Sequence, residues 1–272
     1  MEKNKAFYNT FKYLLGSVFL IYYRPKFKNK NVIPESGPII LCGNHIHLYD
    51  QCLPILSTKR MLHYMAKKEY FDSKFAWFFK KSGCISVDRE HHGGNSKEEA
   101  KEVLDNGYAL GIYPEGTRNS LVSKKKELDK IYNMVDDISY KKFKRIMKKN
   151  MTKISQVNLL LSLKEEKKIT ENEFKKYIFD VDNSLKELVN NNIISNIEYL
   201  NSLLLDIKFG TVSLASKTNA TIVPYGIKGK YKLFNNNLEI VFGIPFKVED
   251  NDLESANKRL RNEIISLINN SN

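Results

Sequence analysis

One of the five histidines lies in a pattern that could support acid–base chemistry. His45 follows Asn44 and precedes Asp50 by five residues, directly after a short apolar run that ends at Gly43. A carboxylate at this spacing can bond one imidazole nitrogen across a tight turn, which leaves the other nitrogen to accept a proton. The spacing predicts a general base at His45 with Asp50 as its orienting partner. A purely structural His/Asp pair is the alternative interpretation.

The sequence offers no nucleophile to accompany this base. A Gly-x-Ser-x-Gly elbow is absent, and Cys42, Cys52 and Cys84 have no activating sequence context. A base without a nucleophile of its own would have to activate a hydroxyl on the substrate. The pattern therefore favours direct transfer of a group to that hydroxyl over a covalent enzyme intermediate.

Two further motifs place charged residues where predicted strands end. The run from Gly111 to Arg118 reads Gly-Ile-Tyr-Pro-Glu-Gly-Thr-Arg, and the run from Gly83 to Arg89 reads Gly-Cys-Ile-Ser-Val-Asp-Arg. Gly116 would permit close approach of a substrate, and Arg118 could hold a phosphate with its planar fork. Taken alone, the first motif also fits a surface turn and the second a surface Asp/Arg pair.

Alternating strand and helix patterns surround these motifs. Helices are predicted at 95–106, 212–220 and 252–269, and strands at 37–43, 84–87, 108–113 and 220–223, with a later pair at 230–234 and 238–242. This alternation predicts an α/β fold with a mixed, partly parallel sheet flanked by helices.

A long segment interrupts the α/β pattern. Between Leu121 and Phe209 there is no Gly or Pro, although the chain has 13 and 7 of them, and apolar residues recur at helical spacing. We interpret 121–206 as a helical insertion of three or four helices within an α/β domain formed by 31–120 and 207–272. A lid, a membrane-docking element, a partner surface and a neutral expansion are all compatible with its position.

The first 30 residues contain an apolar stretch from Tyr13 to Tyr23 with basic residues on both sides. A bilayer-spanning helix needs about 20 apolar residues, which this stretch does not supply. The pattern for 1–30 predicts a helix lying in the membrane interface, and an ordinary buried first helix is the alternative.

The net charge of +13 favours anionic partners, namely membrane headgroups, nucleic acid or an acidic carrier protein. A Lys-, Asn- and Ile-rich composition typical of an AT-rich genome accounts for part of this charge without any function. Three cysteines at no metal-ligand spacing make a disulfide framework improbable, which indicates a reducing compartment.

Taken in order, four motifs resemble those of the 1-acyl-sn-glycerol-3-phosphate (lysophosphatidic acid) acyltransferase family of glycerolipid acyltransferases. They are Asn44-His45 with Asp50, Gly83 to Arg89, Tyr113 to Arg118, and Ile222-Val223-Pro224. Asn119 stands where the family usually has Ser, and 121–206 is unmatched.

The resemblance implies that His45 deprotonates the acceptor hydroxyl while Asp50 orients it. It also implies a substrate-binding set that positions the glycerophosphate and shapes the lipid pocket, comprising Arg89, Glu115, Gly116, Thr117, Arg118 and Pro224. Neither a metal nor a cofactor is required, and acyl-CoA or acyl carrier protein is the donor substrate. The implied product is phosphatidic acid, made at the cytoplasmic face of the cell membrane by a peripheral or monotopic enzyme.

Three alternatives remain at this point. A different lysolipid could be the acceptor, or the chain could be a catalytically silent module that binds membranes. A nucleic-acid-binding protein is suggested by net charge alone, and the sequence contains no recognisable nucleic-acid module, so no nucleic-acid partner is expected.

Overall fold

The computed structural model describes residues 4–88, 95–136, 138–249 and 252–269. Its contacts divide the chain into two compact units. The sheet unit comprises Met1–Asn44, Leu48–Pro114 and Ile207–Leu267, and the helical unit comprises His45–His47, Glu115–Asp206 and Ile268–Asn272. Each unit is described by itself below.

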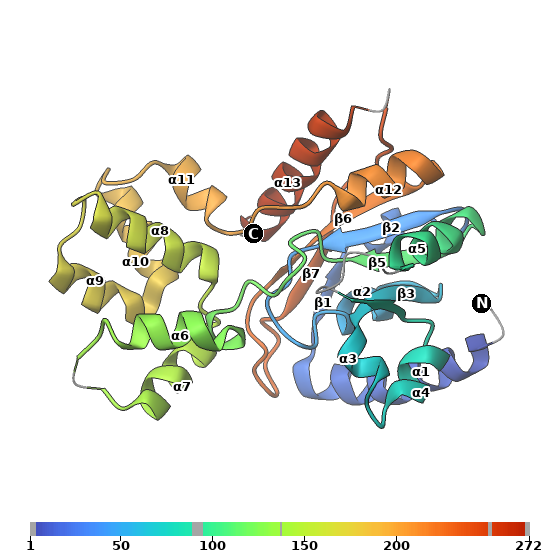
Figure 1. Ribbon diagram of the computed structural model, residues 1–272, viewed down its shortest axis with the longest axis horizontal. Helices are drawn as coiled ribbons and strands as arrows, with labels where there is room; N and C mark the ends of the chain where they lie inside the picture. Colours follow the sequence, from blue (N-terminus) through green and yellow to red (C-terminus); the bar gives the residue numbers. More distant parts are fainter. Residues whose placement is uncertain (1–3, 89–94, 137, 250–251, 270–272) are drawn as a thin grey trace. The chain divides into compact units, whose positions relative to one another are not determined.

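The sheet unit contains a seven-stranded mixed sheet, counted over the described residues (Figure 1). Its strand order is β1-β7-β6-β2-β5-β3-β4, and the β6–β7 pair is antiparallel while the other pairs are parallel. The strands are β1 (Lys26–Lys28), β2 (Ile39–Gly43), β3 (Leu62–Lys67), β4 (Ile85–Val87), β5 (Ala109–Ile112), β6 (Thr221–Lys228) and β7 (Glu239–Phe242). The predicted α/β class with a mixed, partly parallel sheet is confirmed.

Strand β2 lies in the interior of this sheet because every one of its side chains is apolar or absent. All five of its residues are buried, as expected for a strand covered on both faces. Ile39 and Leu41 pack with Phe19 and Leu53 in one core. Successive side chains of a strand point to opposite faces, so Ile40 and Cys42 face the other side.

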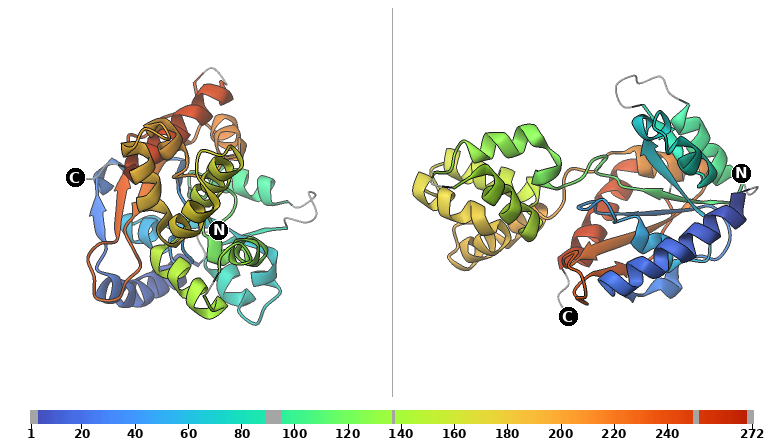
Figure 2. Two further views of the ribbon diagram at one scale, coloured as in Figure 1. Left: turned by 90° about the vertical axis from the view of Figure 1, so that its left-hand side faces the viewer. Right: turned by 90° about the horizontal axis from the view of Figure 1, so that it is seen from below.

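Helices cover the sheet (Figures 1 and 2). The helices of this unit are α1 (Lys5–Tyr23), α2 (Cys52–Ser57), α3 (Lys68–Phe71), α4 (Ala76–Lys81), α5 (Ser96–Asp105), α12 (Gly210–Thr218) and α13 (Leu253–Asn269), with a 3-10 turn at Lys30–Val32. Helices α1 and α2 contact each other, as do α5 and α12, and α12 also contacts β2 and β6. Among the described residues no helix combines the length and the apolar character needed to cross a bilayer.

Two glycines make room for tyrosine rings of neighbouring strands. Gly43 on β2 lies opposite Tyr225 on β6, and Gly111 on β5 lies opposite Tyr64 on β3. A Cβ atom at either glycine would come within 2.3 Å of the facing ring. The glycines that the sequence places at these strand ends are therefore required by packing.

The strand predicted at 230–234 is wrong. The partner of β7 is the end of β6, which continues to Lys228, and residues 229–238 form the connection. Gly229 ends β6 in a left-handed conformation (φ +85°), and a Cβ atom there would lie 1.7 Å from the carbonyl oxygen of Asn237. Because the chain must turn at this glycine, the following aromatic residues cannot continue the strand.

The helical unit contains six α-helices between 121 and 206 within its described residues, more than the three or four predicted. They are α6 (Lys125–Tyr132), α7 (Tyr140–Asn150), α8 (Ile154–Glu165), α9 (Glu171–Tyr177), α10 (Val181–Asn190) and α11 (Asn196–Asn201), with 3-10 turns at Leu121–Ser123 and Ile178–Asp180. Left-handed residues at Met151, Lys167 and Asn192 provide the turns that glycine usually supplies. Capping boxes at Thr170 and Ser195 then begin the next helices.

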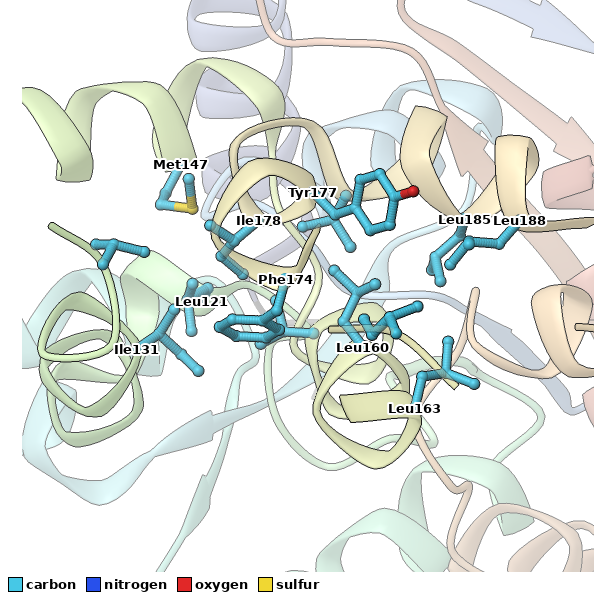
Figure 3. Close-up of a cluster of buried hydrophobic side chains, with 14 of the residues drawn as sticks. Leu121, Ile131, Met147, Leu160, Leu163, Phe174, Tyr177, Ile178, Leu185 and Leu188 are labelled. Atoms are coloured by element: carbon cyan, nitrogen blue, oxygen red, sulfur yellow. The ribbon is translucent and has the colours of Figure 1, made fainter. Parts of the chain in front are cut away.

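The helical unit has a hydrophobic core of its own (Figure 3). Phe143, Leu160, Phe174, Leu185 and Leu188 are each fully buried in it. A core of this size indicates that the segment folds as a packed bundle and not as a linker.

Candidate active site

The loop after β2 begins at Asn44, whose side chain is held by two hydrogen bonds. Asn44 is buried, and its side chain bonds both backbone groups of Ile227 on β6: Oδ1 accepts from the N–H (2.7 Å) and Nδ2 donates to the C=O (2.9 Å). These two bonds hold the end of β2 against β6 immediately before His45. The motif contains Asn44, but the sequence gives no signal for a partner 183 residues away.

Asp50, at the other end of this loop, is fully buried in the sheet unit. The hydroxyl of Tyr231 donates a hydrogen bond of 2.6 Å to Asp50 Oδ1. Burial, together with the neighbouring Asp50 carboxylate, raises the pKa of Tyr231 well above its usual range. The role of Tyr231 was missed by sequence reasoning, which placed the residue in a strand at 230–234.

Three more tyrosines of the sheet unit have buried hydroxyls. The hydroxyl oxygens of Tyr64, Tyr113 and Tyr225 are all buried, and burial raises the pKa of each well above its usual range. The Asp50 carboxylate adds to this rise for Tyr113 and Tyr225. The rings of Tyr64 and Tyr113 stack with centroids 5.9 Å apart. Tyr113 and Tyr225 therefore lie close enough to Asp50 for its carboxylate to favour their protonated forms, and Gly43 makes room for the ring of Tyr225.

His45 belongs to the helical unit, where its backbone is held at both polar groups. Its N–H donates to Glu115 Oε1 (2.7 Å), and its C=O accepts from the N–H of Asn119 (2.6 Å). Glu115 is 3% exposed, and its second oxygen accepts the N–H of Leu205 at 3.0 Å. The structure thus brings the predicted residues His45 and Glu115 together.

The rest of the third motif forms the turn after β5. Gly116 has a left-handed backbone (φ +67°), a conformation that glycine adopts without strain. Thr117 and Arg118 follow it and are half-buried. Their contact with a substrate stays a prediction.

The remaining predicted site residues lie elsewhere. Pro224 is buried within β6 beside Cys42 of β2, and Asp50 shares this sheet unit with it. Arg89 lies outside the described residues, and its neighbour Asp88 pairs with Lys68 at 3.1 Å. His45 and Asp50 are five residues apart in the chain, and a direct hydrogen bond between their side chains stays a prediction.

Lys153 is a charged neighbour of Glu115 that the sequence did not reveal. Burial lowers the pKa of Lys153, while Asp182 and Glu115 oppose this shift. Asp182 in turn accepts hydrogen bonds from Gln156 (2.6 Å), Tyr199 (3.1 Å) and Lys186 (2.7 Å). No cluster of three or more potential metal ligands occurs among the residues that the structure describes.

The fold is that of a known class of α/β acyltransferases. The crystal structure of the 1-acyl-sn-glycerophosphate (LPA) acyltransferase PlsC from Thermotoga maritima matches with a TM-score of 0.54, covering 99% of this chain and 83% of that one. The two sequences are 14% identical, so this likeness concerns the fold.

The sequence profile described as Acyltransferase matches residues 24–228, and the chain belongs to this family. The resemblance inferred from the four motifs is thereby confirmed. A curated relative, the 1-acyl-sn-glycerol-3-phosphate acyltransferase of Bacillus subtilis (strain 168), is 37% identical over 97 residues. That alignment covers 35% of this chain and 49% of the relative, so the chain matches about half the relative's length.

The bond from Tyr231 to Asp50 yields a testable prediction. Tyr231→Phe removes the hydroxyl that bonds a fully buried carboxylate, and we expect the free energy of unfolding to fall by about 2 kcal/mol at neutral pH. Urea unfolding measures the change. Tyr13→Phe, at a residue that is 65% exposed, is the matched control and should be neutral. Equal stability of the two variants would contradict the assigned bond.

The stability difference between wild type and Tyr231→Phe should also depend on pH. The raised pKa of Tyr231 means that the unfolded chain releases this proton at lower pH than the native protein. The stabilising contribution of Tyr231 is therefore complete below about pH 10, the ordinary tyrosine pKa, and declines as the pH rises above it. The stability difference between wild type and Tyr231→Phe should shrink over that alkaline range.

Proposed function

We propose that the chain is an acyltransferase that moves a fatty acyl group from an acyl thioester to the sn-2 hydroxyl of 1-acyl-glycerol-3-phosphate, giving phosphatidic acid. The observation that carries this proposal is the position of His45, in the first motif at the end of β2. Its backbone is held by Glu115 of the third motif and by Asn119, which directly follows that motif. The family match and the names of the similar proteins support it. A different lysolipid acceptor is compatible with the same residues.

The reaction follows from a base without a protein nucleophile. His45 takes the proton of the acceptor hydroxyl as that oxygen forms a bond to the thioester carbonyl carbon. The carbon–sulfur bond then breaks, and the imidazolium returns the proton to the departing thiolate. Asp50 would stabilise the imidazolium, with its own carboxylate held by Tyr231. Arg118, together with Arg89, would bind the acceptor phosphate.

The donor would be acyl-CoA or acyl carrier protein. Both are anionic, and a net charge of +13 suits either of them.

An apolar surface on the sheet unit suits a membrane as the source of the lipid acceptor. Helix α1 exposes a row of large apolar side chains, and the neighbouring aromatic residues continue it. Phe7 of α1 contacts Trp77 of α4 (5.9 Å between centroids), and Tyr22 contacts Phe234 (5.4 Å). We call this surface the α1 face, and it comprises Tyr13, Leu14, Leu15, Val18, Ile21, Tyr22, Phe75, Trp77 and Phe234.

Cationic side chains accompany the α1 face. Arg24 lies over the ring of Phe234, Lys74 over Phe75 and Lys81 over Phe7. Exposed apolar and aromatic residues with adjacent cations are typical of helices that lie in the interface of an anionic membrane. The α1 face would therefore dock on the membrane surface, with the chain peripheral or monotopic.

Membrane docking is tested by placing charge on the α1 face. Leu14→Glu/Ile21→Glu should weaken binding to phosphatidylglycerol-containing vesicles by more than about tenfold. Two exposed apolar side chains that would enter the membrane are lost, and the anionic lipid repels the new carboxylates. Sedimentation with vesicles measures this. Ile197→Glu changes an apolar residue of the helical unit that is 70% exposed, and should leave binding intact. If both variants bind like wild type, another surface contacts the membrane.

The proposed reaction is tested by thiol release. Acyl-CoA and acyl carrier protein are each supplied with and without 1-acyl-glycerol-3-phosphate, and His45→Gln should lower acceptor-dependent release about 10³-fold because the base is lost. His47→Gln is the matched control within the same loop and should stay active.

Release that survives in His45→Gln would remove His45 as the base. Wild type that releases no thiol from either donor, across a panel of lysolipid acceptors, would instead favour a silent membrane-binding module.

A further inference from the structure

Asn119 connects the His45 backbone to the segment that follows the third motif. Its backbone N–H donates to the carbonyl oxygen of His45 (2.6 Å), and the residue is 1% exposed. Its side chain bonds Ser155, a residue of the helical segment. Nδ2 donates to the hydroxyl of Ser155 (2.8 Å), and Oδ1 accepts the N–H of Ser155 (3.0 Å).

Ser155 lies in the first turn of α8 and extends this connection. Its hydroxyl donates to the carbonyl oxygen of Ser202 at 2.5 Å, immediately after α11. The side chain of Asn119 thus stands at the N-terminus of one helix of the bundle, and Ser155 ties that helix to the end of another. Asn119 is held by two bonds to one residue, which fixes the plane of its amide group.

A second connection runs through Glu115. One carboxylate oxygen accepts the N–H of His45 and the other accepts the N–H of Leu205. The two backbone polar groups of His45 are therefore bonded to two residues, each of which is also bonded to the 121–206 segment. One contact reaches the segment at Ser155 and the other at its C-terminal end.

We propose that the helical segment 121–206 is a positioning element for His45 and that Asn119 is the positioning residue that transmits its effect. The two bonds to Ser155 hold the side chain of Asn119 and so restrict the movement of the backbone N–H that the same residue donates to His45. A general base must be held within a fraction of an ångström of its productive position. Removing the bonds between Asn119 and Ser155 should therefore lower the rate of proton transfer. This inference rests on the proposed role of His45.

The experiment compares variants that remove bonds between Asn119 and Ser155 with a variant that leaves these bonds intact. Asn119→Ala removes both side-chain bonds to Ser155 but keeps the backbone N–H, and Ser155→Ala removes the hydroxyl bonds from the other side. Asn150→Ala is the matched control, because Asn150 bonds the carbonyl oxygen of Phe179 (2.7 Å) within the same bundle. Thiol release gives kcat and KM for the acyl donor, and amide hydrogen exchange follows the peptide that contains 45–47.

Asn119→Ala should lower kcat about tenfold or more with little change in KM, and should speed exchange at 45–47. Ser155→Ala should have a smaller effect in the same direction. The double variant should be no worse than Asn119→Ala alone, because the two residues act through one connection. Asn150→Ala should keep both the wild-type kcat and the wild-type exchange at 45–47.

Folded Asn119→Ala with wild-type kcat and exchange would overturn the proposal, as would an equal loss in Asn150→Ala. If Asn119→Ala does not fold, Ser155→Ala decides by the same two measurements. Wild type without acyltransferase activity would refute the proposed function alone, since hydrogen exchange at 45–47 still reports whether Asn119 holds His45.

Discussion

The arrangement around His45 depends on the hydrogen bonds that the Glu115 carboxylate accepts. This carboxylate is buried, and burying a charge is costly unless hydrogen bonds compensate for the lost water. The compensation comes from backbone N–H groups 70 and 90 residues away in the chain, those of His45 and Leu205. One side chain thus holds together the turn after β5, the loop after β2 and the point where the chain returns from the helical segment.

A second buried carboxylate plays the corresponding part in the sheet unit. Asp50 is held by Tyr231, and its carboxylate acts on the buried Tyr113 and Tyr225. The rings of Tyr225 and Tyr64 lie over Gly43 and Gly111. Since those glycines are opposite Tyr225 and Tyr64 in register, the alignment of the sheet determines where the phenols lie. In the same sheet, two hydrogen bonds hold the side chain of Asn44 against the backbone of Ile227. The residues before and after the His45 loop are therefore positioned by sheet geometry.

Two departures from the pattern that the four motifs resemble meet at one point of the structure. Asn119 stands where the resemblance implies Ser, and the helical segment follows directly after it. The longer amide of Asn119 makes two bonds to Ser155 of that segment, whereas a serine hydroxyl could form fewer bonds. Asn119 and the segment therefore form one structural feature, in which the segment is bonded to the residue that holds the carbonyl group of His45.

The sequence was informative where the signal is local. The alternation of strands and helices predicted the α/β class, and the absence of Gly and Pro after Leu121 indicated the helical segment. Partners distant in sequence could not be predicted, since Tyr231, Ile227 and Leu205 carry no local mark of what they bind.

Local patterns also failed where tertiary contacts decide. Strand β3 was not among the predicted strands, and in the structure it pairs with β4 and β5. The strand expected at 230–234 was excluded by the turn at Gly229. The number of helices in the bundle was underestimated because left-handed Met151, Lys167 and Asn192 end helices without glycine.

The central claim, that one carboxylate holds both His45 and the end of the helical segment, is tested most directly by site-resolved amide hydrogen exchange in wild type and Glu115→Gln. A neutral amide keeps a single acceptor oxygen and makes weaker bonds than a carboxylate, so exchange should quicken at both His45 and Leu205. Exchange within α10 should stay unchanged. Wild-type protection at both amides in the folded variant would contradict the account.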